Sequence, residues 1–238
     1  MPEGAFRVSV LVSGSGTNLQ SLIDTVHAAG GPIEIVQVVS SRDDALALER
    51  AAAAGIPCQV VALRGREREE RDRELADVVA AASPGLVVLA GWMSILTGAF
   101  LDRFPDRVVN LHPSLLPAFP GMHAIEQALE WGVRVTGVTV HFAEETVDAG
   151  PPILQEPVPV MYGDSVETLT ERIREVEHRL VPEVVRMFAA GRVRRDPVER
   201  RRVEVVSVEV ECGSVARSSR CRTRPRSTRS RAAWPTSG

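Results

Sequence analysis

The sequence contains no lysine, because all 28 of its basic residues are arginine. This absence excludes a Walker-type phosphate loop, which requires a lysine. Aromatic residues make up only 4% of the 238 residues, so the core of any globular domain must be aliphatic. A hydrophobic content of 44% in a chain of this length is enough to bury one sizeable core.

Cysteines and long apolar segments are also scarce. Cys58, Cys212 and Cys221 are an odd number without a C-x-x-C motif, which excludes a disulfide framework and a zinc site of the usual spacing. The N-terminus lacks the apolar core of a signal peptide. Residues 78–101 carry no charge, but Pro84 and several glycines interrupt them, as a membrane helix would not allow. We therefore predict a cytoplasmic protein without a membrane partner.

Charge divides the chain into two parts. Residues 1–212 carry 21 arginines against 31 acidic residues, a net charge of −10, whereas residues 213–238 carry seven arginines and no acid. The acidic body argues against a nucleic-acid-binding face. We predict one domain over residues 1–200 and an Arg/Ser-rich extension over 201–238, disordered from about residue 213. A nucleic-acid-binding arm in this extension is the alternative.

Apolar runs alternate with amphipathic segments along the domain. Strand-like runs precede helical segments three times in the first 90 residues, which is typical of βαβ units and a parallel sheet. Residues 135–142 and 153–160 are strand-like and closely connected, which favours antiparallel pairing at one edge. The last amphipathic pattern, 166–188, predicts a long helix. The predicted fold class is α/β: a Rossmann-like, mostly parallel sheet flanked by helices, with antiparallel strands at its C-terminal edge.

A glycine-rich loop follows the first predicted strand and opens the first helix. Gly14, Gly16, Thr17 and Asn18 lie where exposed N–H groups and the helix dipole favour a phosphate. A dinucleotide fingerprint would need a third glycine, but that position is Leu19, and no acidic residue ends the second strand. A phosphomonoester is therefore the expected ligand. The alternative is a tight turn in which Thr17 or Asn18 caps the helix.

A second group of polar residues lies at the end of the buried strand at 108–111 and just after it. Alternation places Asn110 and His112 on one side of this strand, about 7 Å apart, near the usual ligand crevice of a parallel sheet. An asparagine can stabilise an oxyanion, and a histidine can transfer a proton. Asp148 follows in a turn and could orient a histidine. The alternatives are that His112 is a structural hydrogen-bonding residue, that Asp148 shapes a turn, and that His141 is structural.

Other chemistries have no motif. The sequence contains no G-x-S-x-G nucleophile, and Cys58 has no nearby base. His112 and His123 are eleven positions apart without a further ligand motif, so no metal site is expected.

Four motifs follow one another along the chain: SGSGTNLQSLID, VVLAGWMSIL, NLHPSLLPAFPG and DAGPPILQEPVPV. Together they resemble the folate-dependent phosphoribosylglycinamide (glycinamide ribonucleotide) formyltransferases of purine synthesis, and the resemblance covers residues 7–193. It implies that 10-formyltetrahydrofolate is the co-substrate and that no metal takes part. It implies small-molecule substrates, and a monomer or homodimer.

The resemblance also assigns roles to particular residues. It implies that Asn110, His112 and Asp148 are catalytic. The remaining implied contacts form two sets: the ribonucleotide and its phosphate are bound by Gly16, Thr17, Asn18 and Glu177, and the folate by Arg68, Met93, Ser94, Ile95, Leu96 and Asn110. Ser94 stands where family members often carry a basic residue.

The implied reaction is direct attack of the substrate amine on the formyl carbon. Asn110 and protonated His112 would stabilise the oxyanion, and Asp148 would raise the pKa of His112 and relay a proton through water. Alternatives within the superfamily are a 10-formyltetrahydrofolate hydrolase, which carries an N-terminal domain, and methionyl-tRNA formylation, which uses a C-terminal barrel. Only six residues precede the first strand, and 45 follow Val193. A non-enzymatic phosphate-binding module is the remaining alternative.

Overall fold

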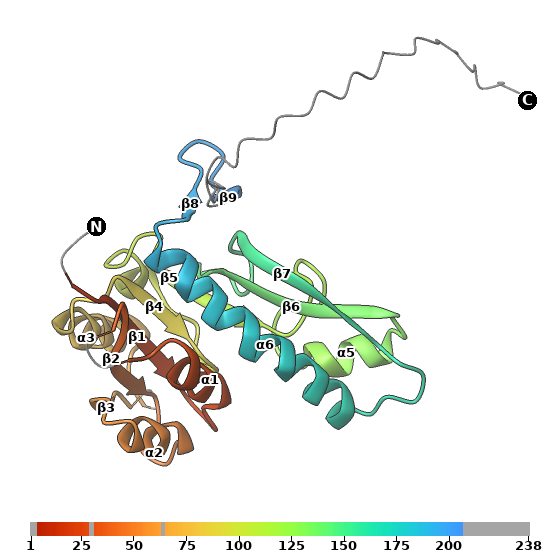
Figure 1. The fold of residues 1–238 in the computed structure, drawn as a ribbon, viewed down its shortest axis with the longest axis horizontal. Helices are drawn as coiled ribbons and strands as arrows, with labels where there is room; N and C mark the ends of the chain where they lie inside the picture. The colour runs from red at the N-terminus through yellow and green to blue at the C-terminus, as the bar shows by residue number, and fades with distance from the viewer. Residues whose placement is uncertain (1–3, 29–30, 63–64, 207–238) are drawn as a thin grey trace, which may run out of the picture. The chain divides into compact units, whose positions relative to one another are not determined.

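Seven strands form one sheet in the order β3-β2-β1-β4-β5-β6-β7 (Figure 1). The computed structural model describes residues 4–28, 31–62 and 65–206. Strands β1 to β5 are parallel, and β6 and β7 are antiparallel to their neighbours. The predicted fold class is therefore confirmed. The strands of this sheet are β1 (Phe6–Val12), β2 (Ile33–Ser40), β3 (Cys58–Val60), β4 (Leu86–Leu89), β5 (Val108–His112), β6 (Val135–Phe142) and β7 (Pro152–Pro159).

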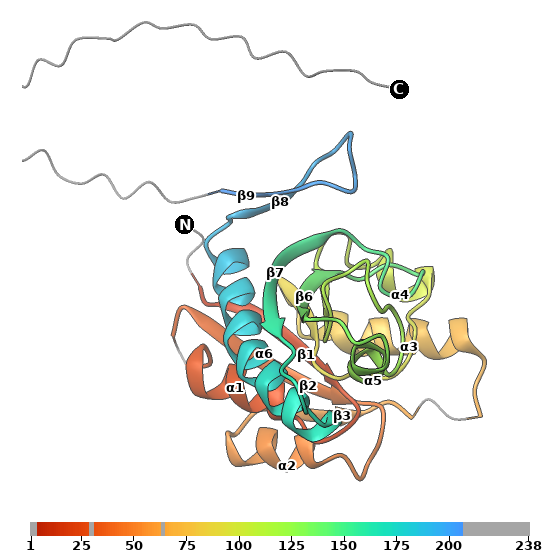
Figure 2. The same cartoon turned by 90° about the vertical axis from the view of Figure 1, so that its right-hand side faces the viewer.

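Helices cover both faces of the sheet (Figure 2). Their bounds are α1 (Thr17–Thr25), α2 (Leu46–Ala53), α3 (Arg68–Ala81), α4 (Gly98–Leu101), α5 (Ala124–Glu130) and α6 (Val166–Ala189). Alternate residues of the strands point to opposite faces. Val10 of β1 packs with α1, α2 and α6, whereas Leu11 packs with α3 and α4. The core is therefore two aliphatic layers separated by the sheet.

The order of the strands creates a crevice at the carboxyl edge of the sheet. From β1 the chain continues to β2 and β3 on one side, and then crosses to β4 on the other side of β1. The loops that follow β1 and β4 consequently diverge, which is the arrangement that opens ligand crevices in doubly wound sheets. Asn110 and His112 lie at the end of the next strand, β5.

Helix α6 follows from a strong sequence pattern. Its buried residues Leu169, Ile173, Val176 and Leu180 recur every three or four positions. The side chain of Ser165 accepts a hydrogen bond from the N–H of Thr168, and the two residues form a capping box. This helix covers β6 and β7 and turns one polar edge toward the crevice.

Several short elements escaped the sequence analysis. The four-residue helix α4 and the seven-residue helix α5 lie in segments to which the sequence analysis assigned no element. A hairpin of β8 (Val193–Arg195) and β9 (Val203–Val205) continues past residue 200 within the same compact unit. The predicted disorder after residue 213 concerns residues outside the described part of the chain. Among the described helices, none is long and apolar enough to cross a membrane.

Candidate active site

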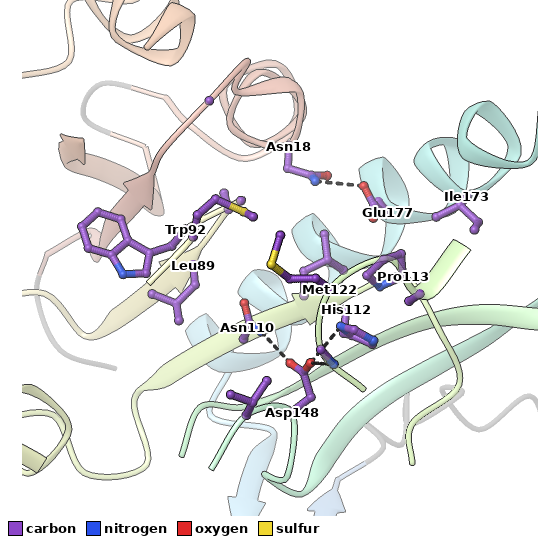
Figure 3. A pocket seen from close by; sticks show the side chains of 18 of the residues that line it. Asn18, Leu89, Trp92, Asn110, His112, Pro113, Met122, Asp148, Ile173 and Glu177 are labelled. Atoms are coloured by element: carbon purple, nitrogen blue, oxygen red, sulfur yellow. Dashed lines mark hydrogen bonds and ion pairs between the residues drawn. The ribbon is translucent and has the colours of Figure 1, made fainter. Parts of the chain in front are cut away.

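One cavity of about 880 Å³ lies at the carboxyl edge of the sheet. Its walls come from the loop after β1, the loop after β4, the end of β5, the loop that contains Asp148, and helix α6. Figure 3 shows Asn110, His112 and Asp148 close together, and Asn18 joined to Glu177 by a hydrogen bond. The cavity thus brings together the two groups of residues that the sequence analysis treated separately.

The glycine loop presents free backbone donors to this cavity. Gly16 has a φ of 70°, and α1 begins immediately after it. No side chain caps the helix, so the interpretation in which Thr17 or Asn18 is its cap is wrong. A Cβ on Gly16 would lie 2.6 Å from the Ala47 Cβ, so only glycine fits beside α2. The first N–H groups of α1 consequently remain available to an anion.

Asn18 and Glu177 form a hydrogen-bonded pair in the cavity wall. The Asn18 Nδ2 donates to the Glu177 Oε2 at 3.0 Å. Burial raises the pKa of Glu177, while Asn18 and the nearby Arg174 act in the opposite direction. The Asn18 Oδ1 is buried and has no hydrogen-bond partner among the described residues. A buried acceptor and a buried carboxyl at the same place fit a ligand that brings hydroxyl or amine donors.

Arg174 lies one turn before Glu177 and also lines the cavity. The sequence analysis missed it, although the i, i+3 spacing from Glu177 places both on one side of α6. Arg174 is exposed and faces the same cavity as the glycine loop. It is the only basic side chain among the described residues that line this cavity, apart from the histidines.

Asn110 and His112 both contact Asp148. The Asp148 Oδ2 lies 3.2 Å from the His112 Nδ1, and the Asn110 Nδ2 donates to the Asp148 Oδ1 at 3.4 Å. The side chains of His112 and Asp148 are 5% and 8% exposed, so little water screens this contact. The structure therefore brings together the three residues that the resemblance implied to be catalytic.

The turn that carries Asp148 is tightly built. Asp148 has a φ of 51°, and its Oδ2 accepts a hydrogen bond of 2.8 Å from the Gly121 N–H. A Cβ on Gly150 would meet the Phe142 carbonyl oxygen at 1.8 Å, so the backbone of this turn lies against β6. Burial acts to raise the pKa of Asp148, but His141, the Gly121 N–H and His112 outweigh it and keep this pKa below its ordinary value.

Both ring nitrogens of His112 face acceptors. The Nε2 lies 2.7 Å from the carbonyl oxygen of Phe119, so it must carry the proton of the neutral ring. The Nδ1 faces Asp148. Burial lowers the pKa of His112, and the opposing effects of Phe119 and Asp148 do not compensate. Asp148 does act to raise the pKa of His112, as expected, but desolvation of the imidazolium is the larger effect and the net shift is downward.

This direction makes the stability of the protein depend on His112. Protonation costs more in the folded state than in the unfolded state, where the pKa is near 6.5. The contribution of the neutral His112 ring to the free energy of unfolding is therefore fully present above pH 6.5. It is lost as the pH falls toward the lower pKa that His112 has in the folded state. Between pH 7 and pH 5.5, we expect the free energy of unfolding to decrease by a smaller amount in His112→Asn than in the original chain.

Urea unfolding at the two pH values measures this difference. The matched control is His123→Asn, because the His123 side chain is 67% exposed. This control should retain the full pH dependence of the original chain. An equal decrease in stability for His112→Asn and the original chain would contradict the expected effect of burial.

His141 supports the trio from the neighbouring strand. It is 2% exposed, and its Nδ1 lies 2.8 Å from the Phe142 carbonyl oxygen, which assigns the ring proton to Nδ1. The Nε2 lies 3.3 Å from the Asn110 Nδ2 and 3.6 Å from the Asp148 Oδ1, so it faces both residues. His141 thus orients the amide of Asn110.

The segment after β4 forms an apolar wall of the cavity. Met93 and Ile95 are 69% and 43% exposed, Leu96 is buried, and Ser94 lies between them. The Ser13 Oγ accepts from the Met93 N–H at 3.1 Å and holds this segment beside the glycine loop. Exposed apolar side chains within a cavity favour a flat, largely apolar ligand.

Arg68 lies at the rim and not in the cavity wall. Its Nη2 donates to the Ile95 carbonyl oxygen at 3.3 Å, and the Nη2 of Arg71 approaches the same oxygen at 3.5 Å. Both guanidinium groups therefore lie at the Ile95 carbonyl, but that of Arg71 is buried and paired with Asp72. Within the described part of the chain, no group of three or more His, Cys, Asp or Glu residues is arranged to hold a metal ion.

The fold and site define a class: an α/β protein with an amide, an imidazole and a carboxylate beside an uncapped glycine loop. The family model described as formyl transferase matches residues 6–185. The chain therefore belongs to the formyl transferase family.

Individual relatives also support membership of the formyl transferase family. The phosphoribosylglycinamide formyltransferase of Escherichia coli is 43% identical over 189 residues, covering 79% of this chain and 89% of the relative. The human trifunctional purine biosynthetic protein adenosine-3 is 46% identical over 188 residues, again 79% of this chain. The chain spans only 19% of that relative, and equally little of its bovine counterpart.

Solved structures show the same similarity. The crystal structure of glycinamide ribonucleotide transformylase 1 from Symbiobacterium toebii has a TM-score of 0.81 and 46% identity. The match covers 85% of this chain and 95% of that one. The phosphoribosylglycinamide formyltransferase of Coxiella burnetii, solved with CHES, has a TM-score of 0.78 and 38% identity.

Proposed function

We propose that this chain transfers a formyl group from 10-formyltetrahydrofolate to the amine of glycinamide ribonucleotide. The observation that carries the proposal is that the trio of Asn110, His112 and Asp148 shares one cavity with an uncapped glycine loop. The glycine loop offers a site for a phosphate, and the trio offers a separate site for the transfer of an acyl group. The relatives named phosphoribosylglycinamide formyltransferase support this choice of substrates.

The two substrates fit opposite parts of the cavity. The N–H groups at Gly16, Thr17 and Asn18 would bind the phosphate, with Arg174 as a neighbouring positive charge. Glu177 and the free Oδ1 of Asn18 would accept from the hydroxyl or amine groups of the ribonucleotide.

The folate would lie against the apolar wall after β4. Met93, Ile95 and Leu96 offer the apolar surface that a pterin ring needs. The acidic tail of the folate would reach the rim beside Ser94, where Arg68 supplies positive charge in place of a basic residue at position 94.

In the reaction that we propose, the acceptor amine attacks the formyl carbon and forms the new C–N bond. One N–H of the Asn110 Nδ2 turns from its long 3.4 Å contact with the Asp148 Oδ1 and stabilises the resulting oxyanion. The proton that the amine loses passes to the pair of Asp148 and His112. Because the lowered pKa keeps His112 neutral at rest, its Nδ1 can hold this proton, and both acceptors then stabilise the imidazolium. Cleavage of the bond from carbon to N10 follows, and the proton returns to N10 of the leaving tetrahydrofolate.

An acceptor panel tests the proposal. The full chain is incubated with 10-formyltetrahydrofolate and glycinamide ribonucleotide, glycinamide riboside or methionyl-tRNA, and mass spectrometry identifies the products. We expect formylation of the ribonucleotide at a rate at least about a hundredfold above the other two. Formylation of the tRNA, or formate as the main product in every mixture, would refute the proposed acceptor.

A further inference from the structure

Helix α2 supports the glycine loop from the side away from the cavity. The Ala47 N–H donates to the Gly14 carbonyl oxygen at 3.2 Å. The Arg50 Nε donates to the Ser15 carbonyl oxygen at 2.8 Å. Two successive carbonyl groups of the loop are therefore held by α2, while the loop itself lines the cavity and Arg50 does not.

These two contacts determine where the loop N–H groups point. In a trans peptide the C=O and the following N–H point in opposite directions. Because α2 holds the carbonyls of Gly14 and Ser15, the N–H groups of Ser15 and Gly16 are directed away from α2. The close approach of Gly16 to Ala47 leaves the loop no room to rotate toward the helix.

Arg50 also connects the loop to α1. Its Nη1 donates to the Gln20 Oε1 at 3.2 Å, and the Gln20 Nε2 donates to the Asp24 Oδ1 at 2.8 Å. One half-buried guanidinium therefore bridges the loop and the helix whose first N–H groups would bind the phosphate. Loss of this bridge would leave the Ser15–Gly16 peptide without a partner for its carbonyl.

We propose that Arg50 is a positioning residue for phosphate recognition, which orients the Ser15–Gly16 peptide without contacting the substrate. The inference rests on the proposed function, because it needs the loop to bind a phosphate. It goes beyond that function by assigning part of the specificity to a residue on α2. A preorganised set of donors binds an anion more tightly than donors that must first be ordered.

The test compares two acceptors in the full chain and in Arg50→Met. Glycinamide ribonucleotide carries the phosphate, and glycinamide riboside lacks it. We expect KM for the ribonucleotide to rise at least about tenfold in the variant, with kcat within about twofold. For the riboside, kcat/KM should not change. An unchanged KM for the ribonucleotide, or an equal rise for both acceptors, would overturn the role of Arg50.

Two further measurements separate positioning from simple loss of charge and from loss of structure. At 0.5 M salt, where screening acts within about 4 Å, the rise in KM should persist if Arg50 orients the loop, and should disappear if it only supplies a distant charge. Arg50→Lys keeps the charge but not the Nε donor, and should still raise KM at least about threefold. If Arg50→Met melts at a lower temperature than the original chain, Arg50→Lys takes its place in the comparison of the two acceptors.

The matched control is Arg7→Met. Arg7 also donates to one backbone carbonyl, that of Ala82, at 3.0 and 2.8 Å, but does not line the cavity. It should leave both kinetic constants unchanged. If the original chain itself uses the riboside as well as the ribonucleotide, the phosphate site of the proposed function fails. If the original chain prefers the ribonucleotide and Arg50→Met has the same kinetic constants as the original chain, the role of Arg50 is refuted and the proposed function stands.

Discussion

Replacement of Asp148 by asparagine is expected to lower kcat at least about a thousandfold while the fold remains intact. The carboxylate accepts from the Gly121 N–H and faces the Nδ1 of His112 at 3.2 Å. Asparagine preserves the size of the side chain but removes the negative charge that stabilises the imidazolium. Losses of this order follow when the carboxylate partner of a catalytic histidine becomes an amide.

The measurement is kcat with both substrates saturating, together with circular dichroism and a thermal melt. Asp77→Asn is the matched control, because the Asp77 side chain is 70% exposed and pairs with the exposed Arg103. It should retain full activity. A folded Asp148→Asn protein with an activity within about tenfold of the original chain would remove Asp148 from the mechanism.

The second large effect is expected for Asn110→Ala. Its Nδ2 is the donor that we assign to the oxyanion, and removal of one such donor typically lowers kcat by about a hundredfold to a thousandfold. KM for either substrate should change only a few-fold, since the oxyanion exists only in the transition state and the intermediate.

The control for this amide is Gln59→Ala on the exposed edge strand β3. Steady-state kinetics of both variants provide the comparison, and the control should match the original chain. A rise in KM with an unchanged kcat for Asn110→Ala would instead assign Asn110 to substrate binding.

The sequence was sufficient for those parts of the site that lie on regular elements. Alternation along β5 predicted that Asn110 and His112 point to one side, and the structure places both in contact with Asp148. The period of α6 predicted that helix almost to the residue, ending at Ala189 instead of residue 188. Local patterns are informative here because the same side-chain spacing recurs over several turns or residues.

The parts that could not be predicted depend on contacts between distant segments. The Phe119 carbonyl reaches the Nε2 of His112 through an irregular loop, and the sequence has no pattern that specifies its path. The direction of the pKa shift of His112 is a balance between burial and a nearby carboxylate, and burial is known only once the fold is known. Likewise, Arg50 meets the Ser15 carbonyl across 35 positions in the sequence.

Near-zero net charge proved uninformative about the ligands. The chain as a whole carries −3, and its described part is more acidic still, yet both proposed substrates are anions. Local donors account for this: backbone N–H groups at the glycine loop, Arg174 in the cavity wall, and Arg68 at the rim.

The most direct test of the central claim is the rate at which 10-formyltetrahydrofolate is consumed with and without glycinamide ribonucleotide. Formyl transfer by direct attack of the amine requires the acceptor in the cavity together with the donor. We expect consumption to increase at least about a hundredfold when the ribonucleotide is added, with one formylated product for each tetrahydrofolate. Equal consumption without the acceptor would contradict transfer and identify the same trio as the site of a hydrolase.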